Sequence, residues 1–526
     1  MSRNSFSQYK LILFTSIFFT IFYNFSFFGN VFKDYPFAGS NIFYIISLAV
    51  VQIIITNIVF SLFASRLTTK LLLILTLFIS SYTAYFMDVY HVVIDDSMIR
   101  NALQTNLAES SDLFSFKLVI YVLFLGVLPS YIVYKTEVDY ENIKTELYKK
   151  LKSIFISLAI LGIILFSFSK FYASFFREHK PLRYHSNPVF WLYSVNNYII
   201  KSYTNHAIEL KKIGEDAKIL AETSEKRKIM VLVVGEATRA DRFSLNGYEK
   251  ETNPLLKNED IINFTNMYSC GTSTAESVPC MFSVFGRENY DYKKGISTEN
   301  VIDVLNKTNE VNILWRDNNS DSKGVALRVD YEDYRTSKTN TICDEECRDE
   351  GMIVGLDKYI EQHKNKNILI VLHQMGNHGP AYYKRYVKEF EKFAPVCKTN
   401  QLEACTKDEV GNAYDNAVLY TDYFLSKVIN FLKPYSQNFE TSMFYVSDHG
   451  ESLGENGLYL HGMPYFLAPD AQKHVASVMW LGNGKKENVE KPYSQDNLFH
   501  TLLGFFDVKT SVYKEDMDIL NDYKKH

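Results

Sequence analysis

The apolar residues of this chain are concentrated near its N-terminus. Five runs of about 20 residues, with almost no internal charge, precede residue 173, and no comparable run follows. Each run is long enough to cross about 30 Å of hydrocarbon at about 1.5 Å per residue. We therefore predict an N-terminal membrane domain, residues 1–172, with helices at about 11–32, 42–64, 69–88, 117–134 and 153–172.

Basic residues near the ends of these runs predict their orientation. Nine Lys and Arg residues lie on the side of the N-terminus, and three lie on the other side. Because cytoplasmic loops carry the excess of basic residues, we expect a cytoplasmic N-terminus, and an odd number of spans then exports residues 173–526. The first run lacks a small-residue cleavage site, so we interpret it as a retained anchor. The expected location is a bacterial inner membrane, with the large domain in the periplasm.

Residues 173–228 are expected to connect the two parts. An uncharged stretch at 188–200 contains Trp191 and Tyr193, and a charged stretch follows at 211–228. The first stretch suits a helix at the membrane interface with aromatic anchors, although an ordinary surface helix explains it equally well. We interpret the second stretch as a solvated linker.

From residue 229 the pattern changes to short β-branched runs that alternate with helical stretches. The predicted strands are 229–234, 311–315, 368–372, 442–446 and 475–481, near-continuously apolar as in a parallel sheet. The predicted helices are 298–305, 351–362, 412–432 and 495–503. This alternation predicts a three-layer α/β/α domain over 229–526, in which ligands bind beyond the carboxyl ends of the strands.

Composition and cysteine placement agree with an exported, membrane-attached protein. The 56 Lys and Arg residues are outnumbered by 60 Asp and Glu residues, so no nucleic-acid partner is expected. All six cysteines lie in the exported part, and their spacing predicts the disulfides Cys270–Cys280, Cys343–Cys347 and Cys397–Cys405. A metal site is the alternative, but the spacings lack the Cys-x2-Cys pattern of structural zinc. We expect the second pair on one helical turn.

Two predicted strands end in acidic or imidazole side chains. Glu236 follows the strand at 229–234, and Asp448 and His449 follow the strand at 442–446. Taken singly, each is equally well explained as a helix cap or an ordinary strand-end residue. Together at one edge of a sheet, carboxylates and an imidazole form a ligand set suited to zinc.

A hydroxyl cluster lies inside the predicted Cys270–Cys280 disulfide. It contains Thr272, Ser273 and Thr274. Zinc can activate such a hydroxyl as a nucleophile near neutral pH. Spacing alone does not choose among the three, and a disulfide-closed surface loop is the alternative interpretation.

Other candidate residues lie in the same domain. They are His373 and His378 after the strand at 368–372, His461 twelve residues beyond His449, and Lys323 in the polar segment 315–324. Singly, such histidines are more often core or surface residues than ligands, and a lone lysine in a polar loop is usually solvated. These residues indicate a functional site only when they are considered together with the strand-end residues and the hydroxyl cluster.

In combination, these segments resemble the phosphoethanolamine transferases that modify lipid A, a family that includes the mobile colistin-resistance enzymes. The resemblance covers nearly the whole chain and implies five membrane helices followed by an alkaline-phosphatase/sulfatase-like periplasmic domain. It rests on segments 235–239, 270–280, 315–323, 373–380 and 447–454.

The resemblance assigns roles to particular residues. It implies that the catalytic zinc is bound by Glu236, Thr274, Asp448 and His449, with Thr274 as the nucleophile. It implies that substrate phosphate or a second zinc is handled by His378, His461, Lys323 and Ser320. Two departures, Glu276 and the short Cys343–Cys347 spacing, bear on acceptor specificity rather than on the chemistry.

The resemblance also extends to the loop between the third and fourth spans. Asn101, Thr105 and Glu109 recur every four residues, so on a helix they share one face. An amide, a hydroxyl and a carboxylate suit an ethanolamine head group, and in the family these positions contribute to binding of the donor lipid. Without the resemblance, we would interpret this face as ordinary solvated surface.

The function implied is zinc-dependent transfer of phosphoethanolamine from phosphatidylethanolamine to lipid A or another envelope glycan, through a phospho-threonine intermediate. We expect membrane lipids as surroundings, a monomeric chain and reduced attraction of cationic peptides such as polymyxins. The alternatives are a lipoteichoic-acid-type glycerol-phosphate transferase, a membrane-anchored sulfatase or phosphodiesterase, and a non-enzymatic sensor. The three cysteine pairs disfavour the first, and the absence of a Cys/Ser-x-Pro-x-Arg segment around Thr274 disfavours a typical sulfatase.

Overall fold

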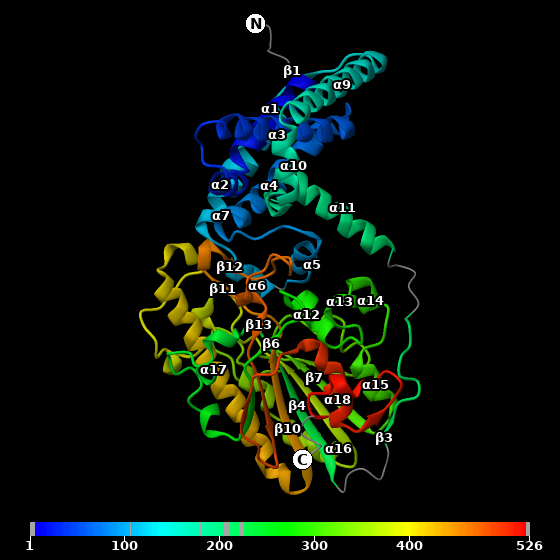
Figure 1. Cartoon of the computed structure of the whole chain (residues 1–526), viewed down its shortest axis with the longest axis vertical. Coiled ribbons are helices and arrows are strands. Elements are labelled where there is room, and N and C mark those ends of the chain that lie inside the picture. Colours follow the sequence, from blue (N-terminus) through cyan, green and yellow to red (C-terminus); the bar gives the residue numbers. More distant parts are fainter. Residues whose placement is uncertain (1–5, 106, 179, 205–209, 220–225, 522–526) are drawn as a thin grey trace. The chain divides into compact units, whose positions relative to one another are not determined.

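The structure is a computed structural model, and it describes residues 6–105, 107–178, 180–204, 210–219 and 226–521. The chain forms two compact units, shown in Figure 1. The first contains residues 1–99 and 114–200, and the second contains residues 100–113 and 201–526. The second unit therefore includes a short segment that the sequence places between two apolar helices.

The first unit consists of apolar helices. Among the described residues, those long enough to span a membrane are α3 (Asn41–Phe63), α4 (Thr69–Val89), the continuous helix Phe116–Lys135 and α9 (Ile143–Ser167). The continuous helix contains α7 (Phe116–Tyr121) and α8 (Leu128–Lys135). A fifth span is completed if α1 (Gln8–Phe22) and α2 (Phe25–Asp34), which are bent by 57° relative to one another, count as one.

The bend between α1 and α2 divides the first apolar run and coincides with a buried polar residue. Asn24 Nδ2 donates hydrogen bonds to the carbonyl oxygens of Phe19, at 2.9 Å, and Asn187, at 2.7 Å. Gln52 Nε2 donates to Asn24 Oδ1 at 2.5 Å. A side chain that bonds the backbone in this way competes with the helical hydrogen bonds, so the helix ends there.

The uncharged stretch after the last span forms α11 (Val189–Thr204). Trp191, which we expected as an interfacial anchor, is buried in the first unit, and its Nε1 donates to Ser80 Oγ at 3.0 Å. The indole is therefore a packing residue of this unit. Composition could not distinguish the two roles, because the indole N–H needs one hydrogen-bond acceptor both at a membrane interface and in a protein core.

The second unit is built on an eight-stranded sheet. Its strands, in spatial order, are β15 (Glu487–Val489), β5 (Ile261–Phe264), β14 (Ser477–Leu481), β10 (Phe439–Ser447), β4 (Arg227–Gly235), β9 (Asn367–His373), β7 (Val311–Asp317) and β8 (Asp330–Asp333). All five predicted strands are present. The expectation of a parallel sheet is wrong at β14, which runs antiparallel to β10 and β5. Burial on both faces makes a strand continuously apolar in either direction, so the pattern could not distinguish them.

Helices cover both faces of the sheet and confirm the three-layer arrangement. Figure 1 shows α17 (Lys407–Leu432) on one face and α15 (Val301–Lys307) with α18 (Leu498–Phe505) on the other. The helix predicted at 351–362 is shorter, because α16 (Leu356–His363) begins after Gly355, whose φ of +78° lies outside the helical region. The main core contains alternate residues of β4, namely Met230, Leu232 and Val234.

The strand register brings four carboxyl ends to one edge of the sheet. Gly235 pairs with Ser447, and Val234 and Asp317 both pair with His373. Gly235 is required at the end of β4, since a Cβ atom there would lie 2.5 Å from the ring of Tyr445. Residues that follow β4, β7, β9 and β10 are therefore close together in space.

Candidate functional site

Thr274 is the hydroxyl that reaches the carboxyl edge of the sheet. It is the first residue of α12 (Thr274–Met281). Its Oγ1 donates to Glu236 Oε2 at 3.1 Å and lies 3.4 Å from His449 Nε2. Thr272 instead donates to the carbonyl of Met463 at 2.5 Å. The geometry thus separates Thr274 from its neighbours, which sequence spacing alone could not do.

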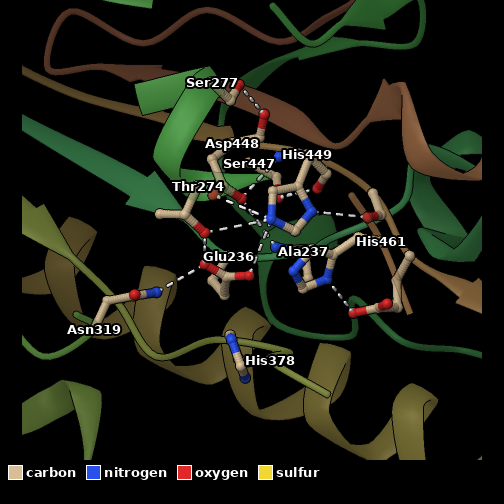
Figure 2. Close-up of polar contacts among 12 residues, drawn as sticks. Glu236, Ala237, Thr274, Ser277, Asn319, His378, Ser447, Asp448, His449 and His461 are labelled. Atoms are coloured by element: carbon tan, nitrogen blue, oxygen red, sulfur yellow. Dashed lines mark hydrogen bonds and ion pairs between the residues drawn. The ribbon is translucent and has the colours of Figure 1, made fainter. Parts of the chain in front are cut away.

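The candidate ligand atoms converge on one imidazole nitrogen (Figure 2). His449 Nε2 lies 3.3 Å from Glu236 Oε1 and 3.4 Å from Asp448 Oδ2. The side chains of these three residues are fully buried. Glu236, His449 and His461 also offer ligand atoms within 4.8 Å of one another. The predicted residues from two separate strands are therefore brought together.

The donor set fits a divalent metal ion. Asp448 Oδ2 accepts no hydrogen bond from the described residues, although it is buried. His449 Nδ1 donates to the carbonyl of Gly450 at 2.8 Å, and this leaves the Nε2 lone pair directed at the carboxylates. Buried carboxylates clustered around an imidazole are costly without a cation, and they provide the ligand chemistry of zinc-type sites.

Neighbouring residues hold the carboxylates in place. Asn319 Nδ2 donates to Glu236 Oε2 at 2.8 Å, and the backbone N–H of Ala237 donates to Asp448 Oδ1 at 3.1 Å. Ala237 adopts a φ of 55°, a conformation unusual for a residue with a side chain and typical of constrained functional turns. Sequence reasoning missed Asn319, although it lies in the segment 315–324 that carries Ser320 and Lys323.

Two further histidines line the same site. The ring of His461 lies 4.1 Å from that of His449 and 5.8 Å from that of His378, centroid to centroid. Burial lowers the pKa of His461 to about 4 and also lowers the pKa values of His378 and His449. The imidazoles are therefore neutral near pH 7, which leaves lone pairs available for a metal ion.

Glu451 is a buried acid that sequence reasoning missed. Its Oε2 lies 3.2 Å from His461 Nδ1, and burial raises the pKa of its carboxyl group to about 8. The sequence feature that could have identified Glu451 is its position two residues after His449, in the segment 447–454. His373, by contrast, is a core residue whose Nδ1 lies 2.8 Å from Asp317 Oδ2.

The two remaining phosphate-handling candidates lie on the loop after β7. Lys323 is largely buried, with its Nζ atom 3.9 Å from Asp321. The carbonyl oxygen of Ser320 accepts a hydrogen bond from Arg335 at 2.8 Å. Within the described part of the chain, no hydrogen bond or ion pair joins either residue to Thr274. Their roles toward substrate stay predictions.

The donor-binding candidates belong to the second unit. Asn101 lies on α5 (Asp96–Gln104), and Thr105 Oγ1 donates to the carbonyl of Asn101 at 2.8 Å. Glu109 lies on a separate helix, α6 (Leu107–Asp112), and its side chain is outside the described part of the structure. The expectation that the three residues share one face of a single helix is therefore wrong, because α5 ends before Thr105. Contacts group residues 100–113 with the domain that carries Thr274.

The six cysteines are joined in the three predicted pairs, with no free cysteine. The Cys270–Cys280 bridge closes the segment that holds Thr274. The expectation of a helical turn at Cys343–Cys347 is wrong, because these residues form an isolated antiparallel β-bridge with a Cα–Cα distance of 3.9 Å. A spacing of four residues fits a tight reverse turn as well as a helix, so the spacing could not distinguish these two local structures.

The fold and the site place the chain among the sulfatase-like enzymes. The sulfatase family model matches residues 228–508, and the model for phosphoethanolamine transferases EptA/EptB matches residues 52–203. Phosphatidylethanolamine transferase Mcr-1 from Escherichia coli is 43% identical over 531 residues, covering 98% of this chain and 97% of that relative. The chain belongs to the phosphoethanolamine transferase family.

Solved structures agree with this assignment. The integral membrane protein lipooligosaccharide phosphoethanolamine transferase A (EptA) from Neisseria meningitidis has a TM-score of 0.92 and 35% identity, with 98% of both chains covered. The C-terminal periplasmic domain of phosphoethanolamine transferase EptC from Campylobacter jejuni has a TM-score of 0.52 and 44% identity over 60% of this chain and 98% of that one. The predicted fold class, and the location in the inner membrane with a periplasmic catalytic domain, are confirmed.

Proposed function

We propose that this protein transfers phosphoethanolamine from phosphatidylethanolamine to lipid A or a related envelope glycan, through a phosphoethanolamine–Thr274 intermediate. One observation carries the proposal. Thr274 lies at the N-terminus of α12, within 3.4 Å of Glu236 and His449, in a chain similar along its length to transferases of this group. The donor is the lipid for which Mcr-1 from Escherichia coli is named, and the acceptor class is that of EptA from Neisseria meningitidis, which is named for lipooligosaccharide.

The first displacement follows from the geometry of Thr274. Its Oγ1 attacks the phosphorus of the donor, the bond from phosphorus to the diacylglycerol oxygen breaks, and diacylglycerol takes up one proton in balance with the proton that Thr274 gives up. Glu236 Oε2 already accepts the Thr274 hydroxyl hydrogen bond, so it is the nearest group to receive the hydroxyl proton. A zinc ion held by Glu236, Asp448 and His449 would lower the pKa of that hydroxyl and neutralise developing charge.

The surrounding residues stabilise the phosphoryl oxygens. The amide end of α12 attracts negative charge, and the neutral rings of His378 and His461 can donate N–H hydrogen bonds. Lys323 is the candidate for a further cationic contact. In the second displacement, a phosphate or hydroxyl oxygen of the acceptor attacks phosphorus and releases the Thr274 hydroxyl. Confinement of the domain to a membrane surface raises the effective concentration of both lipids.

The proposal is tested with the purified full chain and with cells. Mass spectrometry is expected to find phosphoethanolamine on Thr274 after incubation with phosphatidylethanolamine, whereas glycerol phosphate there would support the teichoic-acid-type alternative. Lipid A from a host that lacks this activity should gain phosphoethanolamine when the chain is expressed. An unaltered lipid A profile would direct the search to another envelope glycan. The gain reduces negative surface charge and is expected to lower binding of cationic peptides.

A further inference from the structure

A buried ion cluster attaches the segment 100–113 to the catalytic domain within the second unit. Asp112, the last residue of α6, is 4% exposed, and both of its carboxylate oxygens are bonded. Lys384 Nζ donates to Oδ1 at 2.5 Å, and Arg385 Nη2 donates to Oδ2 at 2.5 Å. Asn400 Nδ2 also donates to the Asp112 carbonyl at 2.7 Å. These contacts join residues at least 272 positions apart in the sequence.

Arg385 is the centre of this cluster. Its side chain is 1% exposed, and each nitrogen of the guanidinium group donates a hydrogen bond. Nε donates to the carbonyl of His378 at 2.7 Å, Nη1 donates to Glu346, and Nη2 donates to Asp112. One rigid, planar group thus contacts the backbone of a site histidine, the disulfide-closed segment 343–347 and the segment 100–113.

The chemistry of the cluster is better suited to fixing the relative positions of its residues than to stabilising the contact. Apolar side chains of similar volume would stabilise the contact as well as a buried ion network does, because the charges must be desolvated. A fully bonded guanidinium group, however, permits one arrangement of its three partners. The cluster therefore fixes the position of α6 relative to His378 more closely than an apolar contact would.

We propose that Asp112 and Arg385 form a positioning clamp for the donor lipid. Asp112 ends the same short helix that carries Glu109, and Arg385 holds the backbone of His378. The clamp keeps the segment that carries the proposed donor-binding residues at a fixed position relative to the phosphoryl site, so a bound phosphatidylethanolamine presents its phosphorus to Thr274. Neither residue contacts the substrate. This inference rests on the proposed function, in which Asn101, Thr105 and Glu109 bind the donor.

The test measures how the donor dependence of the reaction changes. Purified full chain loaded with zinc is mixed with vesicles of increasing phosphatidylethanolamine content, and the initial rate of diacylglycerol release is recorded. Asp112→Asn is expected to raise the KM for the donor about tenfold and to change kcat by less than about threefold. The new side chain is uncharged and keeps one acceptor oxygen, so it can accept a hydrogen bond from only one of Lys384 and Arg385. The zinc content should stay equal to that of the wild type.

A matched control separates positioning from stability. Asp303 is also 4% exposed and forms two hydrogen bonds of 2.6 Å with Arg328, but it lies on α15. Arg328 is 35% exposed, and Asp303 also accepts a hydrogen bond from the Asn300 N–H, so the control matches Asp112 in the burial of the acid and in its pairing with an arginine. Asp303→Asn removes that buried acid outside the donor segment and should leave the donor KM unchanged. If Asp112→Asn lowers kcat and the thermal midpoint while the KM stays at the control value, the clamp is wrong.

A second variant keeps the test decisive if Asp112→Asn does not fold. The Lys384 side chain is 28% exposed, so Lys384→Gln disturbs packing less, and it should raise the donor KM about threefold. A KM equal to that of Asp303→Asn would overturn the clamp. Absence of diacylglycerol release by the wild type would overturn the proposed function, and the clamp with it. Wild-type activity with an unshifted KM in both variants would overturn the clamp alone.

Discussion

Strand β4 has a buried charge near each end, and the two ends differ in how the charge is balanced. Near its start, Lys228 is 6% exposed, lies 2.7 Å from Asp507 and donates to the carbonyl of Phe505 at 2.7 Å. Directly after its end, Glu236 is fully buried, close to Asp448 and to the neutral ring of His449. The protein itself neutralises the first charge. The second group gathers two carboxylates around a neutral imidazole, a set of ligands that fits a divalent cation.

This difference separates a stabilising cluster from a functional one. A buried charge with matched partners contributes to the folded state, and its loss leaves uncompensated charge behind. Buried carboxylates gathered without a cation cost stability, and such local cost is typical of active sites. Substitutions at the two ends of β4 are therefore expected to affect different properties of the protein.

The largest expected effect is on activity at the carboxyl end. Thr274→Ala should reduce transfer by at least about a thousandfold, because it removes the hydroxyl that donates to the Glu236 side chain and lies 3.4 Å from the His449 ring nitrogen. The thermal midpoint and zinc content should change little. Thr274→Ser, which keeps the hydroxyl, should retain part of the activity. Full transfer by Thr274→Ala, measured by mass spectrometry of lipid A, would refute the covalent mechanism.

The second effect is on stability with and without metal. Zinc in about thousandfold excess over its Kd should stabilise the wild type by about 4 kcal/mol, and a chelator should remove this gain. Asp448→Asn should abolish most of the zinc-dependent shift in the thermal midpoint. In the presence of chelator the variant should be at least as stable as the wild type, because the new amide can donate to His449 Nε2. A lower midpoint of the chelated variant would contradict this view of the site.

A smaller effect is expected at the start of β4. Lys228→Met should lower the free energy of unfolding by about 2 kcal/mol, less than for a fully enclosed pair, since Asp507 and Glu440 are 21% and 50% exposed. The transfer rate per folded molecule should not change. Chemical denaturation and a rate normalised to folded protein give the two values. Loss of activity with unchanged stability would show that the two ends of β4 are not independent.

An effect of similar size, but confined to part of the pH range, concerns a buried acid outside both clusters. Asp422, on α17, accepts hydrogen bonds from the N–H groups of Leu255, at 2.9 Å, and Leu256, at 3.0 Å. Burial raises the pKa of its carboxyl group from 3.8 to about 7, so between these values the unfolded chain releases the proton first. Folding stability associated with this group therefore falls as pH rises from about 4 to 7.

Asp422→Asn imitates the protonated acid and tests this dependence. Its stability relative to the wild type should increase between pH 5 and pH 7, by about 2 kcal/mol. Thermal midpoints of both proteins at several pH values give the difference. A difference that does not vary with pH would mean that Asp422 ionises normally in the folded chain.

Local pattern was sufficient for much of the fold. Apolar run length indicated the membrane helices, and β-branched runs indicated β4, β7, β9, β10 and β14, because both signals arise from consecutive residues and their solvent. Strand direction was not encoded in this way, and β14 proved antiparallel. The break at Asn24 was also hidden, since it depends on contacts with Gln52 and Asn187.

In the candidate site, too, local sequence indicated some residues and only tertiary contacts revealed the others. Residue type and strand-end position pointed to Glu236, Asp448 and His449, whereas the choice of Thr274 came from family resemblance and agrees with its contacts. Asn319 and Glu451 were missed, because an amide or an acid in a polar loop has no distinctive local pattern. Burial and hydrogen-bond partners distinguish such residues, and both depend on the packed structure.

By itself, the sequence determined the division into an apolar and an α/β part, the pairing of neighbouring cysteines and the chemical types available at the strand ends. These properties depend on residues close together in the chain. Tertiary structure alone decided which hydroxyl meets the carboxylates, which acids are buried and that Asp112 meets Arg385. Those outcomes arise when strand register and packing bring together residues that are 38 to 273 positions apart, and no local pattern carries that information.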